Sequence, residues 1–222
     1  MQPTKKPKVK ICCIQSTGEA WTAIRYGASA LGLVSEMPSG PGPIPDALIA
    51  EIARAIPPGV SRFLLTSKTS ARAIIDQQKA AGVDTLQLVD RVDLSVYDAI
   101  RQSLPGIQIV QVIHVTGSDA VDLAAEVSSR VDALLLDSGN PSARELGGTG
   151  RLHDWLISRK IREAAEVPVF LAGGLNPRNV AEAVERVSPY GIDVCSGLRI
   201  GSRLDERLLA AFFDALEKSQ PG

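Results

Sequence analysis

The sequence predicts an α/β protein made of one domain, a (β/α)8 TIM barrel, and two observations carry that prediction. Apolar segments of strand length alternate with segments of helical periodicity along the chain, and eight of each can be counted. The segment Ala133 to Leu136 is too apolar for a strand with one wet face, which is typical of a parallel sheet covered on both sides. Eight strand–helix units in 222 residues close most economically into a barrel.

Each predicted strand is a short apolar run bounded by turn residues. In chain order the eight are Val9–Ile14, Ala30–Val34, Ser61–Leu65, Thr85–Val89, Gln108–His114, Ala133–Asp137, Val167–Ala172 and Ile192–Ser196. An open doubly wound sheet is the competing architecture. Its dinucleotide-binding version is disfavoured because no G-x-G-x-x-G follows the first strand.

Each predicted helix has apolar residues at a spacing that gives one buried stripe. The eight are Thr17–Ala28, Pro45–Ala55, Ser70–Ala81, Leu94–Leu104, Ser118–Ser129, Leu152–Ala165, Pro177–Val187 and Arg203–Leu216. Asn176 followed by Pro177 indicates a helix start, with the asparagine as cap and the proline at the first helical position.

Composition limits the function classes. We expect a flexible tail over residues 1–7 and one barrel domain over 8–218, since no linker divides the chain. The net charge of −1 gives no electrostatic footprint for nucleic acid. No apolar stretch has the length of a membrane span or the pattern of a signal peptide, so we expect a cytoplasmic protein with no membrane partner.

The three cysteines, Cys12, Cys13 and Cys195, are an odd number without metal-ligand spacing. Cytosolic proteins keep their thiols reduced. We therefore expect neither a disulfide nor a structural zinc site, and no metal or cofactor is predicted.

A carboxylate and several glycines follow the last predicted strands. Asp137 leaves its strand at the carboxyl end, where barrel enzymes keep their chemistry. A purely local reading, in which Asp137 caps a turn, stays open at this point. Three glycine-containing loops follow strands six, seven and eight, and their backbone N–H groups predict a phosphate cradle. The candidate phosphate-binding residues are Gly148, Gly150, Gly173, Gly174, Ser196 and Gly197.

Several motifs, taken in order, resemble the phosphoribosylanthranilate isomerase family of tryptophan biosynthesis along nearly the whole chain. They are Lys10-Ile11-Cys12, Leu134-Leu135-Leu136-Asp137-Ser138, Gly147-Gly148-Thr149-Gly150, Asp154-Trp155, Leu171-Ala172-Gly173-Gly174-Leu175-Asn176-Pro177 and Asp193-Val194-Cys195-Ser196-Gly197. The resemblance implies a (β/α)8 barrel that performs an Amadori rearrangement of a phosphorylated aminoaldose. It also implies Cys12 as general base and Asp137 as general acid.

These two residue types suit that reaction. Ring opening needs a proton delivered to the ring oxygen, and enolamine formation needs a proton removed from the neighbouring carbon. A free thiol is only a few per cent ionised at neutral pH, so Cys12 needs help to act as a base. Burial of Asp137 would favour the protonated form that an acid requires.

The chain departs from the family pattern directly after the predicted base and in the segment with which the family holds the anthranilate carboxylate. The family has glycine after the cysteine, where this chain has Cys13, and the Pro38–Pro45 segment lacks the family's arginine. A carboxylate needs a cationic or multi-donor partner. Candidates for that cation are Arg199, Arg144, Arg91 and His114, and the candidate substrate-binding residues are Arg199, His114 and Asp193.

The resemblance implies a small phosphorylated sugar amine as substrate, and we expect the protein to be a monomer or homodimer. Two other functions remain open: an isomerase of a different phosphorylated sugar amine, and a non-catalytic paralogue that binds a phosphorylated ligand. Such a binder would need the glycine loops but not the pair of Cys12 and Asp137.

Overall fold

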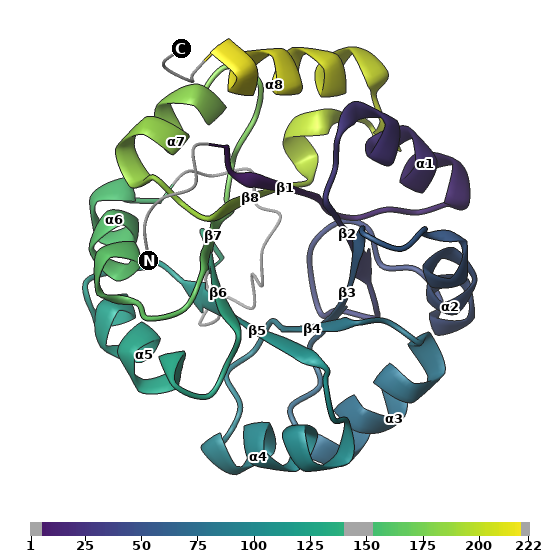
Figure 1. The fold of residues 1–222 in the computed structure, drawn as a ribbon, viewed down its shortest axis with the longest axis vertical. Helices are drawn as coiled ribbons and strands as arrows, with labels where there is room; N and C mark the ends of the chain where they lie inside the picture. The colour runs from purple at the N-terminus through teal and green to yellow at the C-terminus, as the bar shows by residue number, and fades with distance from the viewer. Residues whose placement is uncertain (1–5, 140–152, 219–222) are drawn as a thin grey trace.

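The computed structural model of the protein describes residues 6–139 and 153–218. Eight parallel strands follow one another around a closed barrel, and the last strand pairs with the first. In these two ranges, eight α-helices surround the strands on the outside (Figure 1). The predicted barrel is therefore confirmed.

The barrel strands are buried on both faces. Inward side chains, among them Phe63, Val110, Leu135 and Phe170, fill the barrel, while a larger apolar core lies between strands and helices. The strands are β1 (Lys8–Ile11), β2 (Ala30–Val34), β3 (Ser61–Thr66), β4 (Thr85–Leu88), β5 (Gln108–His114), β6 (Ala133–Asp137), β7 (Val169–Leu171) and β8 (Gly191–Val194).

Local signals at the helix ends agree with the sequence. Ser16 caps the first helix by accepting a hydrogen bond from the Glu19 N–H, and Gly27 ends that helix in the left-handed conformation at φ 110°. The helices are α1 (Thr17–Tyr26), α2 (Asp46–Ala55), α3 (Ala71–Ala81), α4 (Leu94–Ser103), α5 (Asp119–Ser128), α6 (Trp155–Ala164), α7 (Val180–Val187) and α8 (Glu206–Lys218).

Several predicted boundaries differ from the structure, most of them by one or two residues, and three of the differences have a clear cause. Strand β1 ends at Ile11 because Cys13 takes a left-handed backbone conformation, φ 63°, that no strand continues. Helix α7 begins at Val180, three residues after Pro177, because the chain first makes a turn that ends at Asn179. Before α8, the predicted helix start at Arg203 lies instead in a short antiparallel pair, β9 (Arg199–Ile200) with β10 (Arg203–Leu204).

Parallel strands place all their carboxyl ends on one rim of the barrel. Residues that follow β1, β6, β7 and β8, far apart in sequence, meet there. None of the helices in the described ranges combines the length and the apolar character needed to cross a bilayer.

Candidate active site

A pocket lies at the carboxyl-terminal rim of the barrel. Cys12 and Asp137 both line it, and so do Asp193 and Ser196. The other lining residues come mainly from the barrel interior and from the segment after β2. They are Cys13, Val34, Met37, Ser39, Gly40, Pro41, Leu65, Gln87, Val89, Val112, Ala172, Gly173, Gly174, Leu175, Val194 and Cys195. The structure thus brings together the predicted acid, the predicted base and part of the predicted phosphate cradle.

Cys12 lies beside a buried ion pair between the first and last strands. The ammonium of Lys10, fully buried, donates to Asp193 Oδ1 at 2.8 Å. The side chains of Cys12 and Lys10 pass over Gly32 of β2, where an added Cβ would lie 2.7 Å from Cys12 Sγ and 3.0 Å from Lys10 Nζ. A residue with a side chain at position 32 would therefore displace the thiol, the ammonium or both.

Burial and charge set the protonation of this group. Burial raises the pKa of the Cys12 thiol to about 11, against the opposing effect of the Lys10 charge and hydrogen bond. Burial alone would lower the pKa of Lys10, but Asp193 and Cys12 outweigh it, so that pKa is raised and Lys10 stays charged. In the free protein at neutral pH, Cys12 is a thiol next to a cation.

Asp137 stands at the end of β6. Its Oδ1 accepts a hydrogen bond from the Ser138 N–H at 2.7 Å. Burial raises the pKa of the carboxyl above its ordinary value, while the Ser138 N–H and His114 act in the opposite direction. Asp137 is therefore better suited to hold a proton than an exposed aspartate.

The loop after β7 has the shape of an anion cradle. Gly173 and Gly174 both have positive φ, 81° and 65°, which only glycine adopts without strain. The side-chain amides of Asn176 and Asn179 donate to the Gly174 carbonyl oxygen at 3.1 and 3.0 Å. Within the described residues, the N–H groups of Gly173 and Gly174 have no backbone acceptor, which leaves them available to a ligand.

The loop after β8 packs directly on the loop after β7. A Cβ at Gly197 would overlap the Leu175 carbonyl oxygen, so this contact requires glycine. Gly197 itself does not line the pocket, but it holds Ser196 at the pocket wall. The other two candidate phosphate ligands, Gly148 and Gly150, lie outside the described residues.

We expect sulfate or inorganic phosphate to bind at the N–H groups of Gly173, Gly174 and Ser196, both in crystals grown from these salts and in calorimetric titrations. Gly197→Ala should weaken phosphate binding by about ten- to a hundredfold, the scale of one lost charge-assisted contact. Gly18→Ala is the matched control, because an added Cβ there meets only Ser16 Oγ at 3.8 Å. Ordered loops without an anion in such crystals would contradict the cradle.

Arg199 does not line the pocket. Its guanidinium forms an ion pair with Glu19 of α1, with Nη2 2.8 Å from Oε2, and also donates to the Cys13 carbonyl oxygen. The side chains of Arg199 and Glu19 are only 5% and 16% exposed. The prediction that Arg199 replaces the family's arginine in the pocket is corrected by this geometry, since both terminal nitrogens of its guanidinium already have partners outside the pocket, and only Nε is left without a partner among the described residues.

Arg199→Ala should therefore lower stability rather than raise KM. Removing one partner of a buried ion pair costs about 3 kcal/mol, and urea unfolding of the variant would measure this loss. Burial would raise the pKa of Glu19, but Arg199 and backbone N–H groups outweigh burial, so the pKa of Glu19 is lower in the folded protein than in the unfolded chain. The ion pair therefore stabilises the fold at pH values above the pKa that Glu19 has in the unfolded chain, and this contribution is lost as the pH falls through its pKa in the folded protein. Arg186→Ala is the control: its pair with Glu182 is 62% and 51% exposed, and its loss should cost below about 1 kcal/mol.

The other candidate cations also lie away from this pocket. His114 Nε2 is 3.0 Å from the Val89 carbonyl oxygen, and the residue lines a second pocket between β5 and helices α4 and α5. Arg91 pairs with Glu126 at the surface, 2.9 Å apart. Arg144 lies outside the described residues. No lysine or arginine appears among the described residues that line the site.

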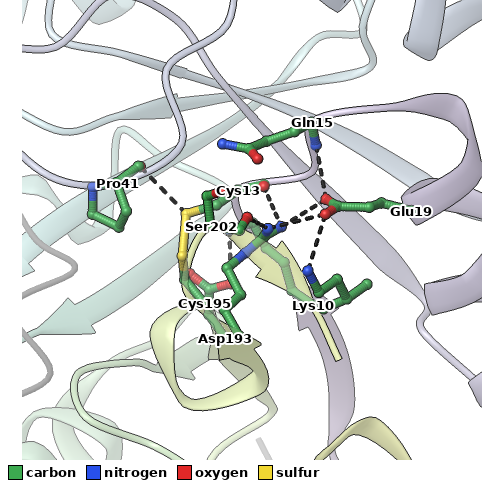
Figure 2. The surroundings of a disulfide bond; sticks show 10 residues. Lys10, Cys13, Gln15, Glu19, Pro41, Asp193, Cys195 and Ser202 are labelled. Carbon is green, nitrogen blue, oxygen red and sulfur yellow. Dashed lines mark hydrogen bonds and ion pairs between the residues drawn. A yellow bond between two sulfur atoms is a disulfide. The ribbon is translucent and has the colours of Figure 1, made fainter. Parts of the chain in front are cut away.

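Cys13 and Cys195 are joined by a disulfide, so the prediction that all three cysteines are free is wrong (Figure 2). Their Cα atoms are 5.9 Å apart, although the residues are separated by 182 positions in sequence. Barrel closure explains the pairing, because β1 and β8 are hydrogen-bonded neighbours and both cysteines follow these strands. Only Cys12 remains as a free thiol.

Two polar residues, one beside the pocket and one lining it, were given no role from the sequence. Lys10 is two residues before Cys12 and so faces the same side of β1, a signal that strand alternation could have given. Gln87 of β4 is buried, and its Oε1 has no hydrogen-bond partner among the described residues. Within the same ranges, no group of three or more His, Cys, Asp or Glu side chains is arranged to hold a metal ion.

Comparison with known proteins agrees with these features. Residues 10–215 match the family model described as N-(5'phosphoribosyl)anthranilate (PRA) isomerase. N-(5'-phosphoribosyl)anthranilate isomerase 2 of Methanosarcina mazei is 36% identical over 193 residues, 86% of this chain and 85% of that protein. The isomerase of Haloferax volcanii is 35% identical over 218 residues, 97% of this chain and 95% of its own.

Solved structures agree with the fold. The phosphoribosyl anthranilate isomerase of Thermococcus kodakaraensis superposes with a TM-score of 0.80 at 26% identity, covering 95% of this chain and 98% of that one. Another isomerase structure, solved in complex with reduced 1-(o-carboxyphenylamino)-1-deoxyribulose 5-phosphate, has a TM-score of 0.80 at 23% identity and covers 96% of this chain and 99% of its own. The chain belongs to the N-(5'-phosphoribosyl)anthranilate isomerase family.

Proposed function

We propose that this isomerase of tryptophan biosynthesis performs the Amadori rearrangement of N-(5-phosphoribosyl)anthranilate, with Cys12 as general base and Asp137 as general acid. The observation that carries the proposal is the meeting of both residues in one pocket with the Gly173–Gly174 loop. Two further supports are the family match over residues 10–215 and the relative whose structure holds a reduced product analogue.

The two residues divide the proton transfers between them. Asp137 gives its proton to the ribose ring oxygen as the bond from that oxygen to C1 breaks, leaving an iminium at C1. The Cys12 thiolate then removes the proton from C2, and the electrons of that C–H bond neutralise the iminium to give an enolamine. The Cys12 thiol then returns the proton to C1 while the C2 hydroxyl loses its proton, which restores the acid form of Asp137, and the product is the aminoketose. The elevated pKa of Asp137 favours the form that the first step needs.

The remaining groups bind the substrate. We place its phosphate on the N–H groups of Gly173, Gly174 and Ser196, with Gly148 and Gly150 as further candidates. Gln87 offers its unpartnered Oε1 to a sugar hydroxyl. Asp193 stays a candidate substrate contact, although it is also the partner of Lys10.

The two pKa directions predict an unusual pH profile. The active form of the enzyme carries a thiolate at Cys12 and a proton on Asp137, whereas the dominant form carries a thiol at Cys12 and a carboxylate at Asp137. The two forms hold the same number of protons, so a change of pH does not alter their ratio. The fraction of the active form is therefore constant between the two pKa values, the higher of which is about 11. We expect kcat/KM to fall at acid pH with Asp137 and to stay level up to about pH 10. An alkaline fall centred near neutrality would contradict this assignment.

Lys10→Met tests the cation beside the thiol. Lys10 lowers the pKa of Cys12, so its removal should raise that pKa and reduce the thiolate fraction. We expect the level part of the kcat/KM profile to drop by at least about tenfold, because a thiol pKa higher by about one reduces the thiolate fraction by that factor. Lys10→Arg, which keeps the charge, should lose less, and an equal loss in both variants would point to geometry instead.

One observation favours a second candidate function. No lysine or arginine lines the described part of the pocket, so no described cation faces the aglycone carboxylate of anthranilate. An isomerase of a different phosphorylated sugar amine, without that carboxylate, fits this absence. A ligand-binding paralogue without activity is less well supported, because it would have no use for Cys12 and Asp137 together.

Turnover of N-(5-phosphoribosyl)anthranilate by the purified protein, followed by the loss of anthranilate fluorescence, tests the proposal. Activity above that of the Asp137→Asn variant is the expected result. No turnover together with phosphate binding would move the assignment to the other sugar amine. A cytoplasmic location and a monomeric or homodimeric state stay predictions from the sequence.

A further inference from the structure

We propose that the Cys13–Cys195 disulfide is a reversible redox tether on the substrate pocket, and that its reduction by a dithiol weakens binding of the phosphorylated substrate. The inference rests on the proposed phosphate site and adds a control to it. Both cysteines line the pocket, Cys13 directly after Cys12 and Cys195 directly before Ser196. The bond therefore joins the residue next to the proposed base with the residue next to the phosphate cradle (Figure 2).

The barrel does not need this bond for closure. Strands β1 and β8 already pair from Lys8 with Gly191 to Ile11 with Val194, and the Cys12 N–H donates to the Val194 carbonyl oxygen at 2.8 Å. What the disulfide adds is a covalent link beyond the last strand residues, in the loops that form the pocket wall. Its effect is therefore local to the site.

The structure also provides for the reduced state of Cys13. The Pro41 carbonyl oxygen lies 3.5 Å from Cys13 Sγ and would accept the proton of the free thiol. Gly42, in the same loop, packs so closely that an added Cβ would lie 2.5 Å from Cys13 Cβ. Cys13 therefore keeps its place in either state, between the loops that follow β1 and β2.

The movement on reduction falls on Cys195. The Cys13 backbone is held by the Arg199 guanidinium, which donates to its carbonyl oxygen. Two unbonded sulfurs cannot remain at bonding distance, so Cys195 must shift. It leads into the 3-10 turn Ser196–Leu198, and Ser196 lines the phosphate end of the pocket. Cys12 and Asp137 are positioned by Lys10, Gly32 and strand β6 instead, and should move little.

The redox step is ordinary thiol–disulfide exchange. A thiolate of the dithiol attacks the Sγ of Cys195, which is the less buried of the two residues, and Cys13 leaves as thiolate and takes up a proton. The second thiol of the reductant then displaces Cys195, which is also protonated. The products are two cysteine thiols and the oxidised dithiol, and a low-molecular-weight disulfide such as glutathione disulfide reverses the reaction.

Cys12 does not interfere with this pair. Its pKa of about 11 keeps it as a thiol, which is a poor nucleophile towards the neighbouring disulfide. In the cytoplasm that the sequence predicts, protein disulfides are mostly transient, catalytic or redox-sensing rather than structural. The location of this bond in a ligand pocket fits the redox-sensing class.

The test compares the full-length protein after oxidation by glutathione disulfide and after reduction by dithiothreitol. Thiol titration of the unfolded chain should count one thiol in the first sample and three in the second. Reduction should weaken inorganic phosphate binding, measured by calorimetry, by about three- to tenfold, the scale of ordering one or two side chains. The KM for N-(5-phosphoribosyl)anthranilate should rise in parallel, while kcat changes less than about twofold.

Two variants serve as controls. Cys195→Ser should bind phosphate as weakly as the reduced protein and should not respond to dithiothreitol. Cys13→Gly should also be unresponsive, and glycine suits the left-handed φ of 63° at that position, so this variant keeps the test usable if the first one misfolds.

Equal phosphate affinity in the oxidised and reduced protein would overturn the proposal, and so would three thiols after oxidation. A fall in kcat with KM unchanged would also overturn it. Because phosphate binding needs no turnover, a redox response in a protein that fails to convert the substrate would refute the proposed reaction while supporting the tether.

Discussion

Cys12→Ser should lower kcat by at least about a hundredfold, the smallest usual contribution of a positioned proton-transfer group. Serine nearly matches the shape of cysteine, so the barrel and the Lys10–Asp193 pair should stay in place. The hydroxyl, however, is a far weaker acid than a thiol and supplies almost no anion beside Lys10. Steady-state kinetics should therefore show the loss in kcat, while calorimetry shows phosphate affinity nearly unchanged.

Cys13→Gly is the control for this prediction, because it removes the neighbouring sulfur and leaves Cys12 intact. We expect a far smaller change in kcat and an effect mainly on KM, since Cys13 lines the pocket through its bond to Cys195. Equal losses of kcat from Cys12→Ser and Cys13→Gly would mean that the wrong thiol has been assigned, or that neither is catalytic.

The architecture could be predicted because it depends on a repeated, local signal. Each apolar segment and each helical stripe can be recognised alone, and only a closed parallel sheet buries eight such segments on both faces. Boundaries were missed where a single backbone conformation decides them. The left-handed conformation of Cys13 ends β1, although the sequence stays apolar beyond it. A turn that ends at Asn179 makes α7 begin later than predicted, although Asn176 and Pro177 are typical of a helix start.

The candidate site divides in the same way. Asp137 and the Gly173–Gly174 loop could be placed together because strand ends share one rim, which follows from topology, whereas the role of Cys12 was indicated only by the resemblance to the isomerase family. The disulfide and the Arg199–Glu19 pair depend on which side chains face each other after closure, which requires the register of β1 with β8. The expectation of a reducing compartment also disfavoured a disulfide, but the redox state of a compartment does not indicate which cysteines lie close together in the fold.

Asp137→Asn should remove nearly all turnover, by roughly a hundred- to ten-thousandfold in kcat, and leave ligand binding intact. The amide keeps an oxygen that can accept the Ser138 N–H, as Asp137 Oδ1 does now at 2.7 Å, so β6 and its loop should keep their structure. The amide cannot give a proton to the ring oxygen. Steady-state kinetics would report the loss, and calorimetry with inorganic phosphate would show the unchanged site.

Asp90→Asn is the matched control for Asp137→Asn. Burial raises the pKa of Asp90 as well, although nearby His114 lowers it, but this carboxyl lines the second pocket and not the proposed active site. We expect its kcat to stay within about twofold of the parent, the range of substitutions that make no contact with the transition state. If Asp137→Asn kept more than about a tenth of the parent kcat, or if both variants lost activity equally, proton delivery by Asp137 would be refuted.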